Sequence, residues 1–112
     1  MRSYFEQRAM LARLETARAE TERQIAIIER QITARAERMT ISTRVKARQF
    51  GRASTTGTRA DERDFQANIA ALRFERHDDI NALARKLARQ AGAIVAFRVR
   101  YRINEPERDA AS

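Results

Sequence analysis

The chain has 112 residues, which leaves room for one small domain and for little core unless the chain pairs with itself or with a partner. Charged residues make up 34% of the sequence and apolar residues 43%, a balance typical of a folded, well-solvated helical protein and not of a disordered one. The net charge of +8 favours an anionic partner, while the absence of cysteine and of any long uncharged apolar stretch excludes a disulfide framework, a thiolate metal site and a membrane span.

The first predicted element is a helix from Ser3 to about Arg38. This stretch contains no glycine or proline and is rich in strong helix formers. In a heptad register that begins at Tyr4, one core row is apolar at five of six positions and the other at only two. Such a seam favours short pairing between copies, or packing against the chain's own second helix, over a long regular coiled coil. The residues expected to carry self-association are Leu11, Leu14, Ile25, Ile28 and Ile32.

The next stretch, residues 39–50, changes in character. Several of its residues are β-branched, and apolar and polar side chains alternate from Ile41 to Arg48. Alternation with a period of two favours a strand over residues 40–49. The alternative is that the first helix continues to Gln49, with its threonine hydroxyls hydrogen bonded to the preceding turn.

A loop predicted at residues 51–60 follows, because this segment holds two glycines and four hydroxyl side chains and offers nothing to bury. It divides the chain into two parts. We therefore describe residues 1–50 as a long coiled-coil-like helix and a basic segment, residues 61–104 as a helix followed by a basic strand, and residues 105–112 as a polar tail.

The second predicted helix runs from about Glu62 to Ala91. Asp61 offers a cap at its start and Gly92 a stop at its end. Arg76 interrupts the apolar stripe and is followed by residues that can cap a new helix, which leaves open a break between Arg76 and Asp79. The apolar residues at helical spacing are Phe65, Ile69, Leu72, Ile80, Leu83 and Leu87.

The last predicted element is a strand at residues 94–103. Apolar side chains from Val95 to Ile103 alternate with polar ones, and the polar face carries three arginines. The sequence therefore predicts a mainly α fold with a long N-terminal helix, a second helix, and a small β element formed by residues 40–49 and 94–103.

Positive charge is segregated along the chain. Residues 38–60 and 80–104 together hold twelve basic residues and no acid, whereas the remainder has eleven basic residues and fifteen acids. Because 21 of the 23 basic residues are arginine, whose planar fork binds phosphate in two places, the two blocks favour contact with nucleic acid. The expected nucleic-acid-binding residues are Arg44, Lys46, Arg48, Arg52, Arg85, Lys86, Arg89, Arg98, Arg100 and Arg102.

Two ordinary explanations compete with this interpretation. Arginine is a good helix former with a solvated head, although that explanation predicts acids interspersed within the blocks as well. Charged strands at the edges of a sheet also prevent aggregation without binding anything. Against the second explanation, like charges directly opposite each other in a ladder repel, and a polyanion would relieve that repulsion.

Two DNA-binding motifs are worth comparing with the sequence. The segment from Leu87 to Gly92 resembles the first helix and turn of a helix-turn-helix, but the buried position of the following helix falls on Arg98. The stretch from Thr40 to Lys46 is similar to the strand of ribbon-helix-helix proteins, but a loop intervenes where their first helix should begin. Neither resemblance implies membership of the family.

Catalysis has little support in the sequence. His77 is the only histidine, and on a helix the two aspartates after it point in other directions. We therefore expect a non-enzymatic nucleic-acid-binding accessory protein that self-associates, with no cofactor, no small-molecule substrate and no membrane partner. The alternative is a structural subunit of a phage or viral particle, in its head, neck or tail. Because a charge follows closely on the first residues, we expect a cytoplasmic location, or the virion in the alternative.

Overall fold

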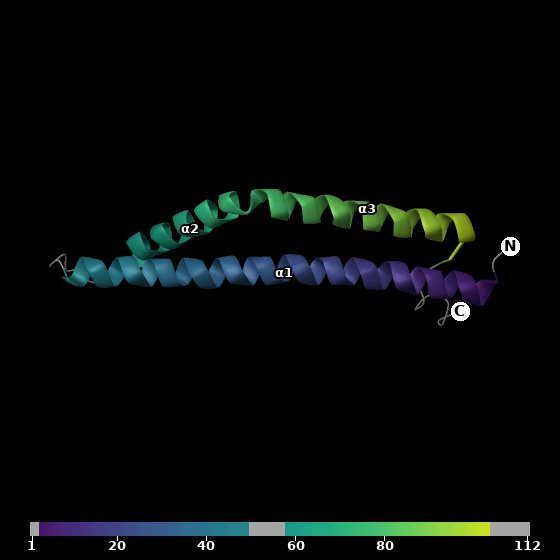
Figure 1. The fold of residues 1–112 in the computed structure, drawn as a ribbon, viewed down its shortest axis with the longest axis horizontal. Helices are drawn as coiled ribbons and strands as arrows, with labels where there is room; N and C mark the ends of the chain where they lie inside the picture. The colour runs from purple at the N-terminus through teal and green to yellow at the C-terminus, as the bar shows by residue number, and fades with distance from the viewer. Residues whose placement is uncertain (1–2, 50–57, 104–112) are drawn as a thin grey trace. The chain divides into compact units, whose positions relative to one another are not determined.

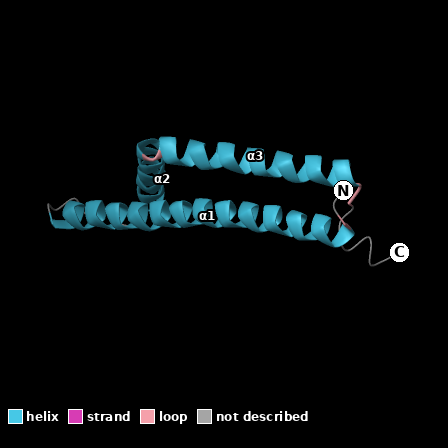
Figure 2. Cartoon of the chain, turned by 45° about the vertical axis from the view of Figure 1, so that its right-hand side comes forward, coloured by secondary structure: helices cyan, strands magenta, loops and turns pink. Residues whose placement is uncertain are grey.

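The computed structural model describes residues 3–49 and 58–103, and 96% of these residues are helical. Three helices follow one another: α1 (Tyr4–Gln49), α2 (Thr58–Glu75) and α3 (His77–Tyr101). No strand occurs in the described ranges (Figure 2). The mainly α prediction is confirmed, and the small β element predicted at residues 40–49 and 94–103 is wrong.

The chain packs as two units. Unit 1 consists of Met1–Gln24 and Ala82–Ser112, and unit 2 of Ile25–Asn81. The helix α1 therefore contributes its first part to unit 1 and its remainder to unit 2, and the boundary within α3 follows Asn81.

Unit 1 is a pair of helical segments that lie side by side, the N-terminal part of α1 and the C-terminal part of α3 (Figure 1). The core joins both segments: Leu11 of α1 is buried together with Ile94 of α3 and with Ile103, which follows α3. Partly buried side chains packed against this core are Leu14, Phe97 and Tyr101.

Polar contacts fix the register of unit 1. The Gln90 Nε2 atom donates to the Ala17 carbonyl oxygen at 3.3 Å, and the buried Thr21 hydroxyl donates to the same oxygen at 3.3 Å. Arg98 forms an ion pair with Glu15 at 2.6 Å. Because residue numbers rise along α1 as their partners' numbers fall along α3, the two segments are antiparallel.

Unit 2 pairs the rest of α1 with α2. Its buried apolar side chains are Ile28, Ile32 and Ala36 from α1 and Leu72 from α2. The Asn68 side-chain amide donates to the Thr40 hydroxyl at 3.1 Å, which places a hydrogen bond between the two helices.

Charged side chains at both ends of the α1–α2 contact also join the two helices. Arg44 pairs with Asp61 at 3.3 Å, and Arg73 pairs with Glu29. Since the low-numbered end of α2 meets the high-numbered end of α1, this pair is antiparallel too.

Residues 40–49 are helical for reasons that the alternative prediction gave. The Thr40 hydroxyl donates to the Ala36 carbonyl at 2.8 Å, and the Thr43 hydroxyl to the Met39 carbonyl at 3.1 Å. These hydroxyl groups are satisfied within the helix, so the two threonines leave no unpaired hydroxyl there. Contacts of this segment with α2 add tertiary stabilisation that the local pattern does not show.

The helix predicted from Glu62 to Ala91 is broken at Arg76, a break that the sequence left open, and the predicted stop at Gly92 is wrong. α2 ends at Glu75, Arg76 forms a turn and α3 begins at His77. Gly92 lies inside α3, where a Cβ atom would meet nothing within 4 Å. The helix continues past it because Ile94, Phe97 and Tyr101 extend the apolar stripe toward α1 at helical spacing.

The C-terminus of α3 is closed by a Schellman motif. Arg102 has a left-handed backbone with φ of 53°, its N–H donates to the Val99 carbonyl, and the Ile103 N–H donates to the Arg98 carbonyl at 2.9 Å. Ile103 then turns back into the core beside Leu11. Residues 94–103, predicted as a strand, thus form the last two turns of a helix and its cap.

Candidate functional site

Most of the cations of α3 lie on one exposed face. At about 100° per residue, four of them fall within an arc of about 100° that excludes the buried Ile94. All four side chains are exposed, and none pairs with a carboxylate of the described residues. No acid occurs between Ile80 and Tyr101. We call this set the α3 cationic face: Arg85, Lys86, Arg89 and Arg100.

Arg98, also predicted to bind nucleic acid, does not belong to this face. Its side chain is 27% exposed and is held by Glu15 at 2.6 Å within unit 1. The ion pair neutralises its charge and fixes its position, so Arg98 contributes to folding of the unit. The strand prediction had placed Arg98, Arg100 and Arg102 on one face, whereas the helix turns Arg98 roughly 160° away from Arg100.

Arg102 lies just beyond α3, at the left-handed position of the Schellman motif. Its side chain is exposed. A left-handed backbone favours glycine, because a side chain there costs about 1–2 kcal/mol. An arginine therefore occupies a position that glycine would fill with less strain.

The first basic block does not form a matching surface. Arg44 pairs with Asp61 across unit 2, while Lys46 is exposed near the end of α1. The backbone of Arg48 is helical, but its side chain and the whole of Arg52 lie outside the described residues. In this part of the chain, therefore, only Lys46 is an exposed cation among the predicted binding residues that the structure describes.

The residues predicted for self-association pack within the chain. Leu11 lies in the core of unit 1, and Ile28 and Ile32 in the core of unit 2. Leu14 and Ile25 are half-buried. This packing agrees with the alternative that the sequence left open, in which the apolar stripe of α1 packs against the chain's own later helices.

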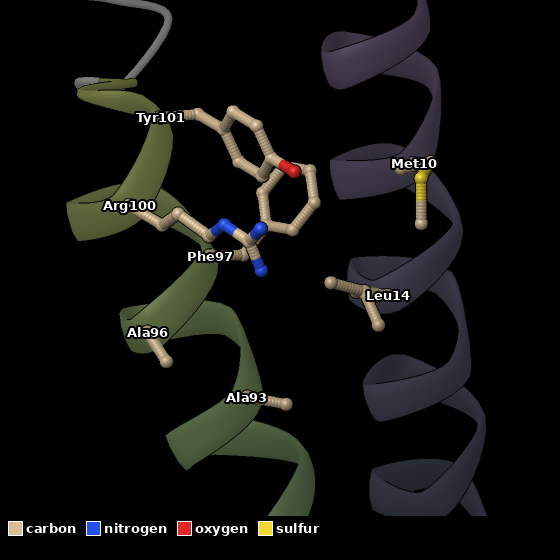
Figure 3. Close-up of a pocket in the computed structure, with 7 residues that line it drawn as sticks. All are labelled: Met10, Leu14, Ala93, Ala96, Phe97, Arg100 and Tyr101. Atoms are coloured by element: carbon tan, nitrogen blue, oxygen red, sulfur yellow. The ribbon is translucent and has the colours of Figure 1, made fainter. Parts of the chain in front are cut away.

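A groove opens in unit 1 between α1 and α3, with a volume of about 670 Å³. Figure 3 shows Met10 and Leu14 on the α1 side and the rings of Phe97 and Tyr101 on the α3 side. The two rings are in tilted contact, with centroids 4.6 Å apart. Aliphatic and aromatic groups therefore form most of the walls.

Among the described residues that line this groove, Arg100 is the only charged one. Its guanidinium lies 5.3 Å from the centroid of the Tyr101 ring, within reach of a cation–π contact. Ala93 and Ala96 line the same side, and their small side chains leave the space open (Figure 3). Arg100 thus belongs both to the α3 cationic face and to the groove.

The described residues offer few groups suited to catalysis or metal binding. His77 is exposed, its Nδ1–H donates a hydrogen bond to the Phe74 carbonyl oxygen at 2.7 Å, and its ring stacks on the Phe74 ring. Within residues 3–49 and 58–103, no three His, Cys, Asp or Glu side chains gather closely enough to hold a metal ion. In the same ranges, no helix has the length and apolar character to cross a membrane.

The fold and the site thus define a protein of paired antiparallel helices with a segregated cationic face. Comparison with models of protein families, with curated proteins and with solved structures found no match.

The groove was missed at the sequence level, although its signal was present. Ile94, Phe97 and Tyr101 are separated by three and four residues, the spacing of a helix face. Alternation of Val95, Phe97 and Val99 concealed that spacing. The small residues that open the groove, Ala93 and Ala96, carry no signal of their own.

Proposed function

We propose that this chain is a non-enzymatic nucleic-acid-binding accessory protein, which contacts phosphates with the α3 cationic face and self-associates through α1. The observation that carries the proposal is the exposed, acid-free row of cations on α3. Like charges four residues apart on a helix, such as Arg85 and Arg89, destabilise it by about 0.2–0.5 kcal/mol, so folding alone does not favour the row. A phosphate backbone relieves this repulsion and releases counterions.

Arg102 supports the same proposal. Its left-handed backbone is strained for any residue other than glycine, and its charge lies within two residues of Arg100. A side chain that raises the energy of the fold while adding an exposed cation next to others suits a binding role.

The proposed self-association uses apolar side chains of α1 that remain exposed within unit 2. Ile27, Ala34, Ile41 and Val45 are exposed there and recur at intervals of seven and four residues, which places them within an arc of about 40° on the helix. Because the buried stripe of α1 is already covered by α2, this exposed row is the side on which a second copy would pack, and Ile41 within it also borders Phe65 of α2. A measurement of mass in solution for Ile41→Glu against the unaltered chain tests it, with dissociation expected.

The binding proposal is tested by removing charge from α3. The triple variant Arg85→Gln, Lys86→Gln and Arg89→Gln is titrated against labelled nucleic acid at several salt concentrations. Each phosphate contact contributes about 0.9 to the salt slope for duplex and about 0.7 for a single strand, so we expect the slope to fall by roughly 2–3. The matched control, Arg13→Gln, Arg30→Gln and Arg35→Gln, removes the same charge from exposed positions of α1.

The control separates a specific surface from net charge. If the two triple variants lose affinity and salt slope equally, the α3 cationic face has no special role. If the unaltered chain binds neither duplex nor single strands in a salt-dependent way, the nucleic-acid proposal fails as a whole.

A second candidate function is that of a structural subunit in a phage or viral particle. Large exposed apolar side chains favour it, since several of them are neighbours on a helix face, such as Ile41 with Val45 and Val95 with Val99. These exposed side chains are Tyr4, Phe5, Ile27, Ile41, Val45, Phe74, Val95 and Val99. Self-assembly to large particles in light scattering, without salt-dependent binding of nucleic acid, is the result that would favour this function.

A further inference from the structure

The groove of unit 1 has the chemistry of a site for a flat, weakly polar group attached to an anion. Its walls are the side chains of Met10 and Leu14 and the rings of Phe97 and Tyr101, and Arg100 is the one charged residue in the part of its lining that the structure describes. At about 670 Å³, its volume falls within the roughly 300–1,000 Å³ of small-molecule sites. A nucleotide combines such a flat ring with a phosphate.

The setting of the groove favours a polymeric anion over a single small one. Arg100 is shared with the α3 cationic face, and Arg89 and Arg85 precede it on the same helix. At 1.5 Å per residue these two cations lie roughly 16 Å and 22 Å from Arg100 along the helix axis. One carboxylate or phosphate needs one cation, whereas a row that continues along the helix fits a chain of regularly spaced charges.

We propose that the groove receives an unstacked base of single-stranded nucleic acid, with Arg100 on the phosphate of that nucleotide and the other cations of the face on neighbouring phosphates. This inference rests on the proposed function and adds a strand preference to it. The base contacts the rings of Phe97 and Tyr101, and the guanidinium of Arg100, which lies beside the Tyr101 ring, binds the phosphate of the same nucleotide. In a duplex, the bases are paired and stacked, so the groove stays empty and only phosphates are contacted.

The groove is tested by filling it. Ala96 is exposed on the rim of the groove, and leucine is a strong helix former, so Ala96→Leu occupies the space without removing a core side chain. Ala88→Leu is the matched control, because Ala88 is an exposed alanine of α3 that does not line the groove. Fluorescence anisotropy follows binding of a labelled oligothymidine strand, an abasic strand of the same length and a blunt duplex.

Base stacking is worth about 1–3 kcal/mol per base, so we expect Ala96→Leu to lower affinity for oligothymidine by about tenfold or more. Affinity for the duplex and for the abasic strand should not change, and Ala88→Leu should behave as the unaltered chain. The unaltered chain should also bind oligothymidine about tenfold more tightly than the abasic strand, which carries the same phosphates.

The failure of this inference is distinct from that of the proposed function. If oligothymidine, abasic strand and duplex bind alike and Ala96→Leu changes none of them, the groove does not take a base, while phosphate binding by α3 stands. If Ala96→Leu abolishes self-association in a mass measurement and leaves strand affinity unchanged, a second copy occupies the groove and the inference is overturned. If no strand binds in any salt, both proposals fail together.

Discussion

Truncation of Ile94 to alanine gives a direct test of how residues 94–103 are folded. In the helix, Ile94 is 3% exposed and packs with Leu11 and Ile103, whereas Val99 is 73% exposed. Truncating a buried isoleucine to alanine costs about 2–5 kcal/mol, and the small core of unit 1 can relax, so we expect about 2–3 kcal/mol for Ile94→Ala. Val99→Ala removes little buried surface and introduces a better helix former, which stabilises by up to about 0.6 kcal/mol.

The two variants are compared by thermal and urea unfolding followed by far-UV circular dichroism. At roughly 4–8 °C per kcal/mol, Ile94→Ala should lower the melting temperature by about 10 °C or more, and Val99→Ala should leave it unchanged or raise it slightly. In a strand, the order would be reversed, because Val99 would share the inward face with Phe97 and Ile103. A larger loss of stability for Val99→Ala than for Ile94→Ala would therefore refute the helical packing of this segment.

Three further predictions concern the same helices. Gly92→Ala should stabilise the chain by about 1 kcal/mol in urea unfolding, because the position is helical and open to a Cβ atom; a loss of stability would show that Gly92 ends a helix. Arg102→Gly should raise the melting temperature, because glycine relieves the left-handed strain, and should weaken binding of nucleic acid. A lower melting temperature would contradict the capping motif. Thr40→Val should cost about 1 kcal/mol by removing the hydrogen bond from Asn68, and a double-mutant cycle with Asn68→Ala should show the coupling.

The helical segments with a strong sequence signal were predicted well. The absence of glycine and proline, together with helix-forming composition, is sufficient for α1 up to Arg38. Ser3 adds a start signal, since its hydroxyl oxygen accepts the Glu6 N–H at 3.1 Å. The break at Arg76 was visible because a charged residue interrupts the apolar stripe just before residues that can cap a new helix.

The two strand predictions failed because a pattern with a period of two over a short segment also contains helical spacings. In residues 94–103, Ile94, Phe97 and Tyr101 form a helix face, while Val95 and Val99 are left exposed. Strands need hydrogen-bonding partners, and once residues 40–49 belong to α1 no partner strand is described for residues 94–103. Tertiary contacts therefore favour helix over strand in both segments. They are the hydrogen bond from Asn68 to Thr40 in unit 2 and the packing against Leu11 in unit 1.

The replacement of the predicted strand by a helix also determines which cations of α3 stay exposed. The segregation of charge is a property of the sequence, since no acid occurs from residue 80 to residue 104 whatever the fold. A strand would have aligned Arg98, Arg100 and Arg102 as a ladder, but the helix turns Arg98 toward Glu15 and leaves Arg100 beside the groove. Arg98 was predicted to bind nucleic acid because no acid lies near it in the sequence. Its partner Glu15 lies 83 residues away along the chain, a distance over which local pattern carries no information. The same helical period that places Arg98 against Glu15 aligns Arg85, Arg89 and Arg100 on the exposed side, so the fold pairs one of the predicted binding residues and gathers three others on one surface.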